Sequence, residues 1–488
     1  MIRPPPSAEP GATHSGVPRG PSRDLYAAGA AVLLVTAAVL VGRHIQGTSR
    51  TLFADWPPLL ASWGPHLGPG TPAAVLVAIA TVAYGPAFAA RLPWRALVPL
   101  TWGTAMAWTY SLALVDGWHR GIAVRLTTPH EYLQVIDRFQ DIPAALRDFT
   151  QHILLGSPDH WPAHIAGHPP AAALTFVLLD RIGLRGGGWA GVWCITVGAT
   201  ACAAVLVTIR ALADEALARR AAPFLVLAPA AVWMGTSADA YFAAVAAWAV
   251  TLLALAVTGR SLWWAGASGL LFGLSCYLSY GLTLVALIAA AVMVLGRHGI
   301  RGRPALLVPL LAGLAVVPTA FTLAGFNWWE AYHLLVTRYY QGVGGIRPYG
   351  YWVWANLACT VLVTGLATAA GLRRTGAVLV RHRRGAPERA AEARLALLVS
   401  AALLALLVAD LSGMSKAETE RIWLPFTLWL LPACAFLTLP QGLGSSPKFS
   451  TLLEQGGPPR AGGTPVRAWL TAQALLALLL NHLLLTRW

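Results

Sequence analysis

Charged residues are scarce in this sequence, and long polar stretches are few. Charged side chains make up 11% of the 488 residues, against about 25% in an ordinary soluble domain. Hydrophobic residues make up 57%, and many lie in runs of about 20, the length at which a helix crosses a bilayer. This composition excludes a soluble globular protein and indicates a polytopic membrane protein. Lysine is almost absent: two lysines accompany 33 arginines, a bias typical of a high-GC, actinobacterial-like genome.

Cysteine is scarce as well, and no nucleic-acid-binding module is present. The five cysteines lack CxxC spacing, which excludes a disulfide framework and a cysteine zinc site. The net charge of +15 comes mostly from short arginine clusters between apolar runs, where the positive-inside rule predicts them in cytoplasmic loops. We therefore expect membrane lipid as a partner and no nucleic acid.

The apolar runs predict an all-α transmembrane bundle with about 13 crossings, within a range of 12 to 14. Residues 1–25 are rich in Pro, Gly, Ser and Arg and predict a disordered cytoplasmic tail, and residues 26–488 form one transmembrane domain. If every run crossed once, the basic segment 210–220 would lie outside, against the positive-inside rule. The conflict disappears if the short run 171–182 does not cross fully. The expected spans are about 25–41, 72–90, 96–115, 187–209, 221–236, 240–258, 262–279, 281–296, 304–325, 351–371, 395–410, 422–440 and 467–486.

One polar segment, 116–168, stands out between two apolar runs. It holds six of the 20 acidic residues and six of the 13 histidines. A charge at the bilayer centre costs about 2.5–3.5 kcal/mol, so this segment is predicted to be a large loop in water. Residues 131–139 and 142–152 predict short amphipathic helices within it.

The predicted orientation places the polar interruptions of later runs on the same outer side as this loop. They are the segments around Asp239 and Tyr280, the aromatic loop 327–351, and the charged segment 415–421. Polar patches that share one face are what a single outward-facing site requires. We therefore expect an active face outside the plasma membrane.

Two motifs in the polar loop carry a family resemblance. Glu131-Tyr132 precedes His168-Pro169-Pro170, at the start of an apolar run, by 37 residues. This order resembles the GT-C membrane glycosyltransferases, among them the protein O-mannosyltransferase, lipid A aminoarabinose transferase and RgtA/B/C/D-like groups. The family pattern has an Asp-Glu pair or a single Asp before the Tyr, in the loop after the first run. Here His130 precedes Glu131 and the loop follows the third run, so Glu131 and Asp116 both remain candidates for the catalytic acid.

The charged segment 415–425, which ends Arg421-Ile-Trp-Leu-Pro425, resembles the charged-then-proline segment near the end of many GT-C cores. Arg421 is the first candidate to bind a lipid-linked phosphate, because guanidinium pairs well with phosphate oxygens. Its alternative role is that of a topogenic charge at a helix end. Arg338 and Arg347 lie in the aromatic loop and are further phosphate-binding candidates, although that loop also fits an interfacial aromatic belt.

The remaining candidates are substrate-binding residues. The segment around Asp239 also fits a helix N-cap, at Ser237 or at Asp239 itself. An acid at a membrane interface is a functional candidate. The full set is Tyr132, His168, Asp239, Tyr280, Tyr349 and Glu420.

We expect no protein metal site. His160, His164 and His168 have helical spacing, but Pro162 and Gly167 interrupt a regular helix between them. The one cofactor considered is a divalent cation, Mg²⁺ or Mn²⁺, held by carboxylates and bridging to a donor phosphate.

The resemblance implies a cell-envelope glycosyltransferase. The enzyme would move a sugar, mannose or arabinose, from a polyprenyl-phosphate donor to an extracytoplasmic acceptor on a glycan or protein. A loop carboxylate would act as general base, and the anomeric centre would invert. The alternative is a transporter or flippase of a lipid-linked saccharide, which would place polar residues at mid-membrane in repeated halves. The sequence has few mid-span charges and no internal repeat.

Overall fold

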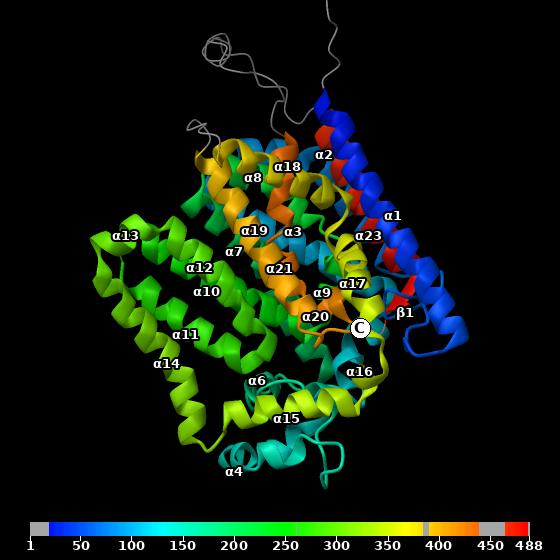
Figure 1. Cartoon of the computed structure of the whole chain (residues 1–488), viewed down its shortest axis with the longest axis vertical. Helices are drawn as coiled ribbons and strands as arrows, with labels where there is room; N and C mark the ends of the chain where they lie inside the picture. The colour runs from blue at the N-terminus through cyan, green and yellow to red at the C-terminus, as the bar shows by residue number, and fades with distance from the viewer. Residues whose placement is uncertain (1–18, 260, 384–389, 439–463, 487–488) are drawn as a thin grey trace, which may run out of the picture.

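The computed structural model describes residues 19–259, 261–383, 390–438 and 464–486 (Figure 1). Within these residues the protein is helical apart from one pair of short strands, so the prediction of an all-α protein is confirmed. Seven described helices are long and apolar enough to cross a membrane, or eight if one bent pair counts as a span. The predicted 13 crossings are not confirmed.

The first part of the chain forms long helices and one strand. They are α1 (Arg19–Thr48), β1 (Ala61–Trp63), α2 (Thr71–Arg91) and α3 (Trp94–Ala113). Helix α1 begins within the stretch predicted to be a disordered tail, because buried Asp24 is bound by Arg373 and Arg374. The helical part of that stretch is therefore 19–25, and residues 1–18 lie outside the described residues.

The polar segment folds into a series of short helical turns. These are η1 (Leu114–Asp116), η2 (His119–Ala123), η3 (Arg125–Thr127), η4 (Tyr132–Phe139), α4 (Ile142–Arg147), η5 (Phe149–His152) and α5 (Ala163–Ala166). The apolar side chains of η4 pack against α6 (Ala171–Arg181), whose 11 residues are fewer than the roughly 20 that cross a bilayer. The segment is thus fixed on the bundle by its own hydrophobic face.

The centre of the bundle is formed by α7 (Gly186–Leu212) and α10 (Ala238–Thr258). Their apolar windows are 67% and 83% buried, so protein rather than lipid surrounds them. Small side chains dominate both helices, and the hydroxyl of Thr208 donates to that of Thr251 across the interface. Close packing of small residues with interhelical hydrogen bonds is the usual way in which membrane helices associate.

Proline and glycine divide several predicted spans into shorter pieces. The run 221–236 becomes α8 (Glu215–Val226) and α9 (Ala231–Met234) around Pro229, and the run 351–371 becomes α17 (Tyr349–Thr364) and α18 (Leu366–Arg383). The axis turns by 108° at Gly365, whose φ of +82° favours glycine. These breaks explain why the structure has fewer full-length candidate spans than the sequence has apolar runs.

The rest of the chain forms peripheral helices and a C-terminal part in which several helices are short. In order they are α11 (Trp263–Leu278), η6 (Tyr280–Leu284), α12 (Val285–Leu295), α13 (Arg297–Gly302), η7 (Pro304–Leu306), α14 (Leu307–Leu323), α15 (Trp328–Gln341), α16 (Val343–Ile346), α19 (Ala390–Leu411), α20 (Thr419–Ile422), α21 (Leu424–Thr427), η9 (Leu431–Thr438), α23 (Thr464–Leu483) and β2 (Leu484–Thr486). Strand β2 pairs antiparallel with β1, and Ala61 lies opposite Thr486.

Helix α15 lies across the end of the bundle that also carries α4 and α6 (Figure 1). The amide of Leu155, in the polar segment, donates to the side chain of Gln341 at the end of α15. The polar segment and the aromatic loop are therefore neighbours at one end of the bundle.

Helix α14 packs on α11 through glycine, which generates the first prediction. A Cβ on Gly269 would lie 2.0 Å from the carbonyl oxygen of Leu310. We expect Gly269→Val to separate the two helices and to destabilise the purified protein by about 1–3 kcal/mol. Thermal unfolding in detergent measures this as a lower Tm. Gly103→Val is the control, since a Cβ there meets open space, and an equal loss in both variants would contradict the account.

Candidate active site

Glu131 is a buried carboxylate at the start of η4. Its backbone is extended, and its side chain lies in the interior with 6% of the residue exposed. Oε1 lies 3.0 Å from Nδ1 of His164, whereas buried Oε2 accepts no hydrogen bond from the described residues. Burial alone would raise the pKa of Glu131, but His164 and Arg421 outweigh it and hold the pKa below its ordinary value. Glu131 is therefore an ionised carboxylate with one oxygen that can accept a proton.

Arg421 in α20 contacts three side chains, those of Asp239, Glu418 and His164. Its Nη1 donates to Oδ2 of Asp239 over 2.6 Å, and its Nη2 donates to Oε2 of Glu418 over 3.3 Å. Nη2 also lies 3.3 Å from Nε2 of His164. Burial alone would lower the pKa of Arg421, but the carboxylates of Asp239, Glu418 and Glu131 raise it. The guanidinium thus stays charged although only 4% of the residue is exposed.

His164 joins Glu131 to Arg421. A guanidinium N–H can only donate, so the Nε2 that faces Arg421 is the acceptor. The proton of a neutral ring then lies on Nδ1, the nitrogen that is 3.0 Å from Oε1 of Glu131, an assignment that follows from the partners. His164 therefore orients the carboxylate of Glu131 and links its charge to that of Arg421.

Asp239 lies in the first turn of α10, where its carboxylate faces Arg421. The N-cap of this helix is Ser237, whose hydroxyl accepts a hydrogen bond from the amide of Asp239. The N-cap role considered for Asp239 thus belongs to Ser237. The carboxylate of Asp239 is therefore available to pair with Arg421. Of the described ion pairs of Arg421, the one with Asp239 is the shorter, at 2.6 Å against 3.3 Å for Glu418.

Glu418 completes the network on the side of α16. Ala417 and Glu418 both have positive φ, at +74° and +64°, a conformation that costs non-glycine residues about 1–2 kcal/mol each. This backbone places Glu418 between Arg421 and Arg347, whose Nη1 lies 3.6 Å from Oε1. Burial would raise the pKa of Glu418, but Arg421 and Arg347 outweigh it and lower the pKa. Arg347 also donates to the carbonyl of Lys416, which fixes its orientation.

Tyr132 and His168 support this network from behind. The hydroxyl of Tyr132 lies 3.1 Å from Nδ1 of His168, and the same nitrogen lies 2.7 Å from the carbonyl of His164. The ring of Tyr132 stacks on Phe176 and meets the edge of Phe242. Burial lowers the pKa of His168 to about 4, so its ring is neutral at pH 7. The two predicted residues therefore hold His164 and the start of η4 in place.

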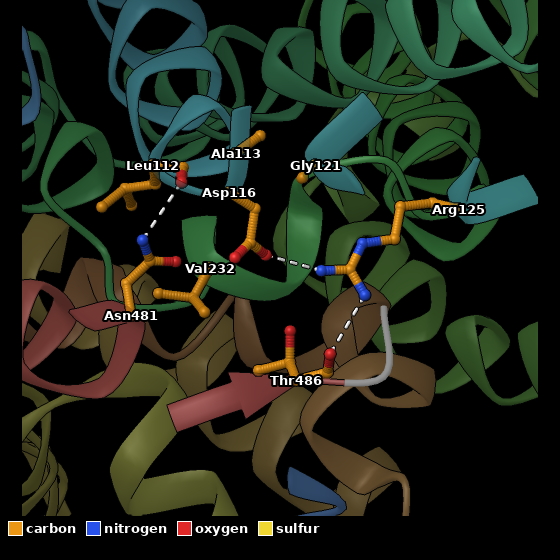
Figure 2. Close-up of a pocket in the computed structure, with 9 residues that line it drawn as sticks. Leu112, Ala113, Asp116, Gly121, Arg125, Val232, Asn481 and Thr486 are labelled. Atoms are coloured by element: carbon orange, nitrogen blue, oxygen red, sulfur yellow. Dashed lines mark hydrogen bonds and ion pairs between the residues drawn. The ribbon is translucent and has the colours of Figure 1, made fainter. Parts of the chain in front are cut away.

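Asp116, the second candidate acid, lies in a different cluster. Oδ2 accepts a hydrogen bond of 2.7 Å from Arg125, and Oδ1 lies 3.1 Å from His66 and 3.7 Å from Arg120. Figure 2 shows that Arg125 also reaches the carbonyl of Thr486 in the C-terminal strand. The adjoining cavity has a volume of about 10 Å³, the size of one water molecule. Both oxygens of Asp116 are therefore occupied by neighbouring side chains.

The remaining predicted residues have other partners. Arg338 donates to the carbonyl of Trp161, Tyr349 donates to that of Leu411, and the Tyr280 ring packs 5.0 Å from that of Trp328. None of these contacts joins them directly to Glu131 or Arg421.

Glu420 is fully buried next to Arg421 in the chain. Its Oε1 accepts a hydrogen bond of 2.9 Å from the amide of Leu60, and Oε2 has no hydrogen bond within the described residues. Burial raises its pKa to about 7. Glu420 thus connects α20 to the loop before β1 and is protonated through most of the acidic range.

The site contains two residues that the prediction from sequence did not include, His164 and Glu418. His164 has a signal in the sequence, its spacing of four residues before His168. Glu418 stands among the charges of 415–421, but only its left-handed backbone places it between two arginines. Within the ranges that the structure describes, no group of three or more His, Cys, Asp or Glu residues has the arrangement of a metal site.

Comparisons with known proteins give a distant likeness. No protein-family model and no curated protein matches the chain. A crystal structure of the Archaeoglobus fulgidus oligosaccharyltransferase with Zn and sulfate is similar at 14% identity and a TM-score of 0.42, covering 72% of this chain and 49% of that one. The same enzyme tethered to an acceptor peptide gives 13% identity, a TM-score of 0.41 and coverages of 77% and 55%. This chain thus spans about half the length of that enzyme. TM-scores below 0.5 do not establish a shared fold.

Glu420 generates a prediction on pH. In the unfolded chain Glu420 titrates near its ordinary 4.5, and in the folded protein near 7. Between these values only the unfolded state loses the proton, so the free energy of unfolding falls by about 1.4 kcal/mol per pH unit and is constant above pH 7. Glu420→Gln remains neutral and removes this loss. We expect its Tm to exceed the parent's by several degrees at pH 8 and by little at pH 5.

The measurement is thermal unfolding in detergent from pH 5 to pH 8. Glu330→Gln, on the exposed surface of α15, is the matched control and should follow the parent at every pH. A Tm difference between Glu420→Gln and the parent that does not change with pH would contradict the account.

Proposed function

We propose that the protein is a membrane glycosyltransferase of GT-C type, with its active site at the end of the bundle that carries the polar segment. It transfers a sugar, mannose or arabinose, from a polyprenyl-phosphate donor to a hydroxyl of an extracytoplasmic glycan or protein. The observation that supports this most strongly is the pair formed by Glu131 and Arg421. A proton acceptor and a buried cation meet through one histidine, at the end of membrane helices.

Glu131 is the general base of this reaction. Its free Oε2 takes the proton of the acceptor hydroxyl, and the acceptor oxygen forms a bond to the anomeric carbon. The bond from that carbon to the phosphate oxygen breaks, and the phosphate leaves with the electron pair. Because attack and departure take place on opposite faces of the sugar, the product has the inverted configuration.

Arg421 stabilises the leaving phosphate. A fixed guanidinium in a buried site stabilises developing negative charge without reorganising at the moment of reaction. Arg347 supports it through Glu418, and Arg338 adds positive charge from α15. The lipid tail of the donor lies along the apolar surfaces of neighbouring helices.

Glu131 is better placed than Asp116 to act as the base. Asp116 is bound at both oxygens by Arg125, His66 and Arg120, which leaves neither oxygen open to an acceptor hydroxyl. Oε2 of Glu131, in contrast, accepts no hydrogen bond from any residue that the structure describes. We assign Asp116 to the support of the C-terminal strand, through Arg125 and Thr486.

The assay is sugar transfer by the purified full-length protein in liposomes, with radiolabelled polyprenyl-phosphate mannose and arabinose. We expect Glu131→Gln to reduce kcat by about 10²–10⁴, the contribution of a general base, because the amide cannot accept the proton. Glu330→Gln makes the same chemical change on the exposed surface and should leave transfer unchanged.

Asp116→Asn separates the two candidate bases. We expect it to lower Tm and to retain transfer within about tenfold at a temperature where it is folded. Loss of transfer in a folded Asp116→Asn with normal transfer in Glu131→Gln would contradict the assignment. If the parent protein moves lipid-linked sugar across the vesicle membrane but transfers none to an acceptor, the proposed glycosyltransferase activity is contradicted.

A further inference from the structure

Three carboxylates lie around Arg421 at the candidate site. Asp239 and Glu418 contact its guanidinium directly, and Glu131 is connected to it through His164. Carboxylate oxygens are the ligands that Mg²⁺ and Mn²⁺ prefer. A cation among them would also lie close to the donor phosphate of the proposed reaction.

The position among these carboxylates is already taken by a side chain. The guanidinium of Arg421 lies 2.6 Å from an oxygen of Asp239 and 3.3 Å from one of Glu418. Glu131 is turned toward His164, at 3.0 Å. A magnesium ion needs six oxygens at about 2.0–2.1 Å in octahedral geometry, so these carboxylates cannot reach one without displacing Arg421.

The charges also disfavour a metal ion. Arg347 adds a second positive charge at 3.6 Å from Glu418, so two arginines neutralise two of the three carboxylates. The third, Glu131, contacts His164, whose other ring nitrogen faces Arg421. A doubly charged ion placed here would be repelled by two buried guanidinium groups at short range. The donor set therefore does not fit a divalent cation.

We infer that Arg421 is the built-in cation of this site, occupying the place of a divalent metal, and that transfer requires no metal ion. Its charge holds Asp239 and Glu418 in position and neutralises the anionic donor. This inference deepens the proposed function and rests on it for the role in transfer. The occupation of the carboxylate cluster by Arg421 is independent of any activity.

The first test is Mn²⁺ binding to the purified full-length protein, measured by the electron paramagnetic resonance signal of free Mn²⁺. If Arg421 takes the place of a metal, Arg421→Ala leaves Asp239 and Glu418 free and creates a Mn²⁺ site that the parent lacks. We expect one additional saturable Mn²⁺ per chain in this variant. The double variant Arg421→Ala/Asp239→Ala removes a ligand and should lose that ion again.

Two results of this titration would overturn the inference. One is a saturable Mn²⁺ in the parent that disappears in Asp239→Ala, which would show that the cluster binds metal with Arg421 present. The other is a folded Arg421→Ala with no additional Mn²⁺, which would show that Arg421 does not stand in a metal's place.

A second measurement uses the parent alone and does not depend on the folding of a variant. Transfer is assayed after EDTA treatment and again after adding Mg²⁺ or Mn²⁺. We expect the rate to stay within twofold throughout. A loss of tenfold or more that the added ion restores would overturn the inference. If the parent transfers no sugar under any condition, the proposed function fails, and the Mn²⁺ titration still decides whether Arg421 is the built-in cation.

Discussion

The buried guanidinium of Arg421 is the interaction on which the site depends. It joins α20 to the first turn of α10 through Asp239, and to the polar segment through His164. A buried charge of this kind is stable only with partners, and removing one partner of a buried pair typically costs about 3–5 kcal/mol. The same contacts that stabilise the charge therefore fix the relative positions of Glu131, Asp239 and Glu418. The ion pairs of Arg421 thus stabilise the fold and also position the residues of the proposed reaction.

The sequence predicted much of this site from residue chemistry. The scarcity of charge makes each acid or arginine beside an apolar run a candidate, and Glu131, Tyr132, His168, Asp239 and Arg421 do lie in one network. Spacing along the chain could not separate Glu131 from Asp116. That distinction depends on Arg125, nine residues further along the polar segment, and on His66, from the loop before α2, which contact Asp116 in the folded protein.

The architecture could be predicted in class but not in detail. Hydropathy identifies apolar runs and so predicts an all-α membrane protein. Hydropathy does not predict the break at Gly365, where one apolar run forms two helices whose axes differ in direction by 108°. Hydropathy also does not predict the left-handed backbone at Ala417 and Glu418, because neither residue type favours positive φ. The left-handed backbone at Ala417 and Glu418 places a carboxylate between Arg421 and Arg347, and irregular backbone of this kind is tolerated in membrane proteins where it is buried in protein.

The most direct test of the account is a cryo-EM structure of the purified protein with bound polyprenyl phosphate. We expect the phosphate within hydrogen-bond distance of Arg421, about 2.7–2.9 Å from guanidinium nitrogen to phosphate oxygen. We also expect Oε2 of Glu131 to face the same space. A phosphate bound by Arg120 and Arg125 beside Asp116, with the network of Arg421 closed and remote from the lipid, would contradict it.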